Sequence, residues 1–151
     1  MLLLAVGVLT ACQSSSSVRK RGYRPESGAK LAVLPAESAK FPEAARKLTE
    51  SLSNANVAGI ETKEVSKVSL EVVQLSIECV EPSPKCYAAV GKSLAASRLL
   101  FAQVSGRSHK VKVTVTLFDV DKQSPKIAEK TFGSEKEATA GIADLVAEAT
   151  R

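Results

Sequence analysis

From residue 29 onward, apolar positions follow the two spacings that distinguish strands from helices. Residues 31–34 and 99–102 are continuous apolar runs, and Pro35 closes the first of them. Such runs are typical of central strands buried on both faces. Residues 110–120 alternate instead, which predicts a strand with one face on the core. Together with weaker patterns elsewhere, strands are predicted at 31–34, 57–65, 98–105, 110–120 and 126–132.

Two helices are predicted in the first half of the chain. Pro42 suits the first turn of a helix over 42–54, where its missing N–H costs no hydrogen bond. Ser66 or Ser69 can cap a second helix that continues to about Cys79. One side of this second helix is apolar and consists of Val68, Val72 and Leu75.

Two further helices are predicted in the second half. Pro84 begins one of them, on which Tyr87, Val90 and Leu94 align. Glycine costs a helix up to about 1 kcal/mol relative to alanine, so we expect Gly91 to pack closely against the sheet. Ser134 and Glu137 have the spacing of a capping box and begin the last helix. Its apolar stripe is Ile142, Leu145, Val146 and Ala149.

The elements follow the order β-α-β-α-α-β-β-β-α. Early strands separated by helices imply parallel pairing, whereas the three late strands form an antiparallel meander. The predicted fold class is therefore α/β (α+β), with a single mixed five-stranded sheet and flanking helices. The domain spans residues 29–151, without an internal repeat or a second domain.

The amino terminus has the pattern of an export signal. The apolar run at 2–9 is far shorter than the ~20 residues that a membrane-spanning helix needs. The residues Leu9, Thr10, Ala11 and Cys12 match a bacterial lipobox, which predicts removal of residues 1–11 and lipidation of Cys12. Two or three acyl chains on one residue suffice for stable anchoring. The alternatives are an ordinary secretory signal and a buried strand that happens to precede a cysteine.

Two details refine this interpretation. The basic residues that usually precede such a run are missing, which leaves open whether Met1 is the true start. Gln13 follows the cysteine where lipoproteins kept at the inner membrane usually have aspartate. We therefore predict an outer-membrane location, with the domain facing the periplasm.

Charge is concentrated in the predicted tether, residues 12–28. The formal net charge of the chain is +5, but residues 18–24 hold four basic residues and no acid, so residues 25–151 have 17 basic and 16 acidic residues. A nucleic-acid-binding domain would instead have a basic stripe on its folded face, so nucleic acid is not an expected partner. The four serines at 14–17 form a spacer, and the basic segment either contacts anionic lipid headgroups or is a solvated linker.

Cys79 and Cys86 are the two other cysteines, separated by a loop that contains prolines. In an exported protein the expected outcome is a structural disulfide, which for about eight residues contributes roughly 2.5 kcal/mol in the loop-entropy model. A zinc site at these cysteines is not favoured, because it would need further soft ligands and the one histidine, His109, lies in a distant turn. A redox-active pair usually has the closer Cys-x-x-Cys spacing. Two free buried thiols would suit a cytosolic protein.

Few residues offer catalytic chemistry. His109, with Ser105 and Ser108 nearby, is the one candidate base for a hydrolase, and a turn histidine explains it more simply. Asp119 and Asp121 are a possible acid–base or calcium pair, but forming the turn before Lys122 is the simpler explanation and is favoured. There is no phosphate-binding glycine loop and no recognisable cofactor motif. The sequence therefore predicts no enzyme activity, no cofactor and no small-molecule substrate.

Three segments carry a family resemblance: the cysteine-bracketed stretch at 79–100, the hairpin strand end at 117–120 and the opening strand at 31–35. Together they resemble the amino-terminal domain of TolB. Similar domains occur in envelope proteins, especially of myxobacteria, in the curli secretion lipoprotein and in lipoprotein activators of penicillin-binding proteins. The resemblance covers about residues 30–150 and implies a docking module without catalytic residues. Ser97 and Arg98 depart from the family pattern, which has aspartate and an aromatic residue there.

These observations predict a lipid-anchored envelope lipoprotein whose domain is a non-catalytic binding or adaptor module. The expected partners are the membrane, through the lipid anchor, and an unidentified envelope protein. One alternative is a subunit of an outer-membrane secretion or assembly complex. A less favoured alternative is a small envelope hydrolase.

Overall fold

The computed structural model describes residues 28–79 and 81–151. The signal peptide predicted at 1–11, Cys12 and most of the tether lie outside the described residues. The elements are β1 (Lys30–Val33), α1 (Pro42–Asn54), β2 (Thr62–Val65), α2 (Leu70–Ser76), α3 (Pro84–Ser93), β3 (Arg98–Ser105), β4 (Val111–Asp119), β5 (Ser124–Phe132) and α4 (Glu135–Thr150). This order, and the single mixed sheet it builds, confirm the predicted fold class.

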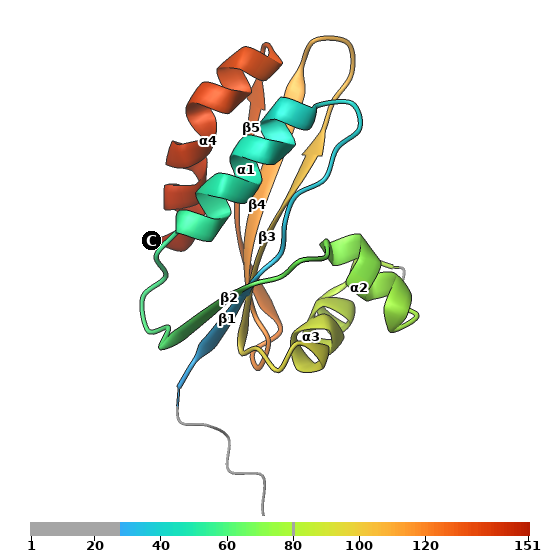
Figure 1. Ribbon diagram of the computed structural model, residues 1–151, viewed down its shortest axis with the longest axis vertical. Helices are drawn as coiled ribbons and strands as arrows, with labels where there is room; N and C mark the ends of the chain where they lie inside the picture. The colour runs from blue at the N-terminus through green and yellow to red at the C-terminus, as the bar shows by residue number, and fades with distance from the viewer. Residues whose placement is uncertain (1–27, 80) are drawn as a thin grey trace, which may run out of the picture.

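The sheet has the strand order β2-β1-β3-β4-β5. β1 is parallel to both β2 and β3, because α1 and the α2–α3 pair return the chain to the same end of the sheet before each new strand begins. β3, β4 and β5 form the antiparallel meander that the short turns require. The meander strands are much longer than β1 and β2, so half of the sheet extends beyond the parallel pair (Figure 1).

Helices α1 and α4 lie side by side on one face of the sheet (Figure 1). The Glu135 side chain at the start of α4 accepts hydrogen bonds from the backbone N–H groups of Glu43 and Ala44, both at 3.0 Å, and so joins the two helix starts. The fully buried residues of this layer include Leu31, Val33, Leu48, Leu52, Leu100, Val111, Val113, Val115 and Ile142. The predicted stripe of the last helix is confirmed, since all four of its members are buried.

Helices α2 and α3 cover part of the opposite face. The Tyr87 ring lies 5.0 Å from the Phe101 ring and 5.5 Å from the Phe118 ring, centroid to centroid, within the range of favourable aromatic pairs. Gly91 packs as closely as predicted, because a Cβ atom added to it would lie 2.3 Å from Cγ2 of Val120. This second core therefore sits at one end of the sheet.

The rest of that face is uncovered and polar. On β4 and β5, Lys112 Nζ lies 2.9 Å from a carboxylate oxygen of Glu129, and Thr114 Oγ1 donates to the same carboxylate at 3.0 Å. The hydrogen bond from Lys112, followed by that from Thr114, lowers the pKa of Glu129. Ile127 is 57% exposed beside them. β5 is an edge strand, and the charged side chains and Pro125 along it oppose pairing with another strand.

The starts of α1 and α4 follow the predicted local rules, whereas Ser69 precedes α2 without a capping hydrogen bond from its hydroxyl. Pro42 occupies the first turn of α1. The Ser134 hydroxyl accepts the N–H of Glu137 at 3.2 Å, which confirms the cap of α4. The Glu137 carboxylate accepts the N–H of Gly133 at 2.9 Å, one residue before the usual capping-box partner.

Two local predictions need correction. The strand predicted at 57–65 is regular only as β2, because the chain first turns through Gly59, whose φ is +75°. The apolar side predicted for the second helix faces outward: Val68 is 42%, Val72 45% and Leu75 66% exposed. The side of α2 that faces α3 is buried instead, and its buried members are Leu70, Val73 and Gln74. A short helix with apolar residues on both sides can bury either side, so the elements packed against it determine which side is buried.

Candidate functional site

Cys79 and Cys86 join the end of α2 to the first turn of α3. Their Cα atoms lie 5.7 Å apart and a disulfide joins them, at a separation that suits such a bond. Gln74 Nε2 donates to Cys86 Sγ at 3.2 Å, so the buried amide of α2 also contacts the bridge. The Ser83 hydroxyl caps α3 by accepting the N–H of Cys86 at 3.2 Å. The pair thus has a structural position between two helices.

The one candidate catalytic base does not meet a nucleophile. His109 is exposed in the turn between β3 and β4, and Ser105 and Ser108 are exposed as well. Within residues 28–79 and 81–151, no hydrogen bond joins His109 to either serine. Ser108 has a φ of +55°, which belongs to the tight turn rather than to a strained strand–helix junction. The arrangement is that of an exposed hairpin turn.

Asp119 forms the predicted turn. One of its carboxylate oxygens, Oδ1, accepts the backbone N–H groups of Asp121 at 3.1 Å and Lys122 at 2.9 Å. The other, Oδ2, is bonded by the Arg98 guanidinium. Burial opposes the charged form, but the Lys122 N–H and the Arg98 charge outweigh it and lower the pKa of Asp119. The carboxylate is therefore held ionised as a structural group. Asp121 contributes its backbone N–H, and not its own carboxylate, to this turn.

The described residues contain no group of three or more histidine, cysteine, aspartate or glutamate side chains placed to hold a metal ion. None of the described helices has the length and apolar content needed to cross a bilayer.

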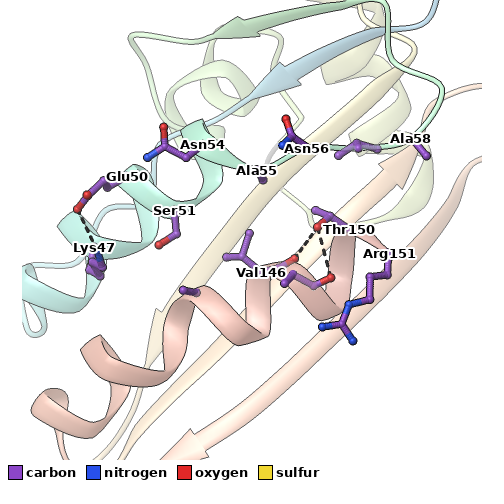
Figure 2. A pocket seen from close by; sticks show the side chains of 13 residues that line it. Lys47, Glu50, Ser51, Asn54, Ala55, Asn56, Ala58, Val146, Thr150 and Arg151 are labelled. Atoms are coloured by element: carbon purple, nitrogen blue, oxygen red, sulfur yellow. Dashed lines mark hydrogen bonds and ion pairs between the residues drawn. The ribbon is translucent and has the colours of Figure 1, made fainter.

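A groove lies between the carboxyl-terminal halves of α1 and α4, and the segment 55–58 closes one of its ends (Figure 2). Its volume is about 790 Å³, which suits a peptide segment or a small molecule. We call it the α1–α4 groove. Its lining residues are Lys47, Glu50, Ser51, Asn54, Ala55, Asn56, Val57, Ala58, Ala143, Val146, Ala147, Thr150 and Arg151.

Local sequence explains why this space stays open. Four of the lining residues are alanines, at 55, 58, 143 and 147, whose side chains end at Cβ and do not fill the space between the helices. The Thr150 hydroxyl donates to the Val146 carbonyl at 2.9 Å, so its hydrogen-bonding capacity is used within α4. Lys63 Nζ donates to the carbonyl oxygens of Ser53 at 2.6 Å and Ala55 at 3.2 Å, which fixes the end of α1 and the segment that follows.

The rim of the groove is polar. Lys47 and Glu50 pair across one turn of α1 at 3.3 Å, so their charges balance. The side chains of Asn54 and Asn56 lie at the rim on either side of Ala55 (Figure 2). An apolar floor beneath hydrogen-bonding groups is the usual composition of a binding site.

A second hollow of about 270 Å³ continues from the groove and shares Val57, Ala58, Thr150 and Arg151 with it. We call it the cationic pocket, because four cationic side chains and one carboxylate line it. These charged residues are Arg98, Lys122, Lys126, Arg151 and Asp119. Asp119 is already bonded to Arg98, and neither Lys126 nor Arg151 forms a salt bridge within the described part of the chain. The pocket therefore has a local excess of positive charge.

The site residues predicted from the sequence do not include the lining of the α1–α4 groove or of the cationic pocket. The sequence marks Asp119 as a turn former and Arg98 as a departure from the family pattern, and neither property indicates a pocket. The alanines of α4 at 143 and 147 were the available signal, because they put small residues beside the predicted apolar stripe. The groove needs the packing of α1 against α4, which lies beyond local sequence patterns.

Comparisons with known proteins give a likeness of fold. No family model matches the chain. No curated protein matches it by sequence. Among solved structures, the PelC dodecamer from Paraburkholderia phytofirmans is 17% identical with a TM-score of 0.44, over 82% of this chain and 90% of that one. The LpoB carboxyl-terminal domain from Salmonella enterica is 16% identical with a TM-score of 0.46, over 70% of this chain and 82% of that domain.

TolB from Acinetobacter baumannii is also among the similar structures, at 16% identity and a TM-score of 0.41, over 83% of this chain and 29% of TolB. The sequence resemblance described above is to the amino-terminal domain of TolB. At these identities and TM-scores the likeness carries no argument about function. Membership of the TolB-like group, and of its myxobacterial branch, stays a prediction.

Proposed function

We propose that the protein is a lipid-anchored adaptor of the bacterial envelope that binds an envelope protein partner through the α1–α4 groove. The observation that carries this proposal is the groove itself, which has an apolar floor, a polar rim and an adjoining cationic pocket. None of its polar side chains forms a nucleophile–base pair of the kind that covalent catalysis requires. Binding is therefore the activity that this geometry supports best.

The lipobox supplies the proposed address. Residues 1–11 act as the signal, Cys12 receives the lipid and residues 12–28 connect it to β1 at the outer membrane, facing the periplasm. A connection of this length spans at most about 60 Å when fully extended. The anchored domain can thus reach partners close to the membrane without being embedded in it.

The cysteine pair is consistent with this address. A disulfide between Cys79 and Cys86 persists in the oxidising envelope and would be reduced in a typical cytosol. The bridge stabilises the α2–α3 end of the domain, which lies on the opposite face of the sheet from the groove (Figure 1). We therefore assign the two cysteines to folding and the groove to binding.

Site-specific crosslinking in living cells tests the proposal. A photoreactive amino acid in place of Ser51, within the groove, should capture one exported protein as a discrete product, identified by mass spectrometry. The same replacement at Thr131, exposed on the uncovered face of β5, is the control. Equal products from both positions, or a product from neither, would contradict an adaptor that uses the groove.

A further inference from the structure

We infer that the α1–α4 groove and the cationic pocket together bind an acidic peptide segment, in which aliphatic side chains are followed by carboxylates. This inference rests on the proposed function and names the chemistry of the partner. The two hollows share four lining residues, so one extended segment can occupy both. The apolar α1–α4 groove would then contact the aliphatic part of the segment, and the cationic pocket would contact its carboxylates.

The charge distribution is the first argument. Residues 25–151 are nearly neutral overall, with 17 basic and 16 acidic residues. The cationic pocket nevertheless gathers four cationic side chains around one acidic side chain, Asp119, and that carboxylate is occupied by Arg98 and two backbone N–H groups. The excess is thus a local feature of this pocket, and it complements a ligand with two or more negative charges.

The availability of the cations is the second argument. The Lys122 side chain is 77% exposed and lies 4.0 Å from Asp119, too far for a strong hydrogen bond. Lys126 on β5 is exposed and makes no salt bridge within the described residues. Both ammonium groups can therefore move toward a ligand without breaking a tight internal pair.

The apolar half sets the other requirement. Val146 and the alanines at 143 and 147 form the side contributed by α4, and the paired charges of Lys47 and Glu50 cancel at the far rim. This half offers small side chains and no net charge, so it suits aliphatic residues rather than phosphates or sugars. A polyanion such as nucleic acid would leave it unfilled.

Selection from a random twelve-residue peptide library displayed on phage tests the inference, with the full chain presented in detergent. We expect the enriched peptides to combine aliphatic residues with at least two acids. The Lys122→Glu/Lys126→Glu variant should bind these peptides about tenfold or more weakly by fluorescence anisotropy, because two attractions become repulsions. The matched control is Lys85→Glu/Lys92→Glu, which reverses two exposed charges on α3 and should leave the affinity unchanged.

A second pair of variants tests the apolar half. Ala143→Leu places a larger side chain in the groove and should also weaken binding about tenfold, whereas Ala140→Leu, exposed on the same helix, should not. Thermal unfolding of each variant checks that the fold is kept. Selection of peptides without acids, equal binding by the charge-reversed variant, or no enrichment would overturn the inference.

The outcome can be separated from that of the proposed function. If crosslinking at Ser51 captures an envelope protein while the peptides show no preference for acids, the adaptor function stands and the acidic-ligand inference fails. If crosslinking at Ser51 also fails, the proposed function itself is wrong.

Discussion

At the scale of single residues, Asp119 joins three parts of the molecule. It ends β4, forms the turn toward β5 and pairs with Arg98 at the start of β3. The turn was predictable, because aspartate commonly accepts nearby backbone N–H groups. The pairing with Arg98 was not, because it joins residues 21 positions apart and depends on the register between β3 and β4.

The lowered pKa of Asp119 leads to a pH-dependent prediction. A carboxylate with a folded-state pKa below its usual 3.8 stabilises the fold fully above that pH, and this contribution is lost as the pH falls below it. Asp119→Asn keeps the acceptor of the turn but removes the charge, and should cost about 1–2 kcal/mol at neutral pH. Urea unfolding from pH 6 to pH 2.5 should show the gap between wild type and variant closing below pH 3.8. A constant gap would contradict this role.

Gly91 offers a second test at this scale. Adding a methyl group raises helix propensity by up to about 1 kcal/mol, but the new Cβ meets the stiff, β-branched Val120 at 2.3 Å and the resulting strain costs about 1–3 kcal/mol. Gly91→Ala should therefore destabilise the domain by about 1 kcal/mol. Val120→Ala in the same chain should relieve the strain, so that the double variant is more stable than the sum of the single effects. Additive free energies of unfolding would exclude the contact as the cause.

At the scale of elements, the meander strands and the long helices were easier to predict than β2 and α2. The alternation in β4 and the stripe of α4 each have one apolar side, so pattern and burial agree. On α2 both sides are apolar. The side that is buried is the one packed against α3, where Gln74 also contacts the cysteine bridge. Val68, Val72 and Leu75 consequently form an exposed strip, and nothing in the sequence alone distinguished that side from the buried one.

The bridge should determine the stability of the α2–α3 pair. Closing a loop of about eight residues stabilises the fold by roughly 2.5 kcal/mol in the chain-entropy model. We expect Cys79→Ala/Cys86→Ala to lose about this amount in chemical denaturation, and wild type treated with a thiol reductant to lose a similar amount. The doubly substituted chain, with no bridge left to reduce, is the control for the reductant. If the reductant leaves wild type unaffected, the bridge contributes nothing in solution.

At the scale of the whole molecule, the two faces of the sheet have different surroundings. One face holds α1 and α4 with the groove between them, and the other is covered at one end by α2 and α3 (Figure 1). The fold class and element order followed from hydrophobic spacing, because each element has a local signature. The groove did not, since it exists only where small residues of two distant segments meet, α1 with its following loop and α4.

The proposed function requires the domain to work outside the cytoplasm, attached to a membrane through Cys12. Mass spectrometry of the protein purified from its native envelope tests it most directly. We predict a chain that begins at Cys12, carries two or three acyl chains and has Cys79 and Cys86 oxidised to a disulfide. A chain that keeps residues 1–11, carries no fatty acid and has both thiols free would rule out the lipid anchor and the envelope location.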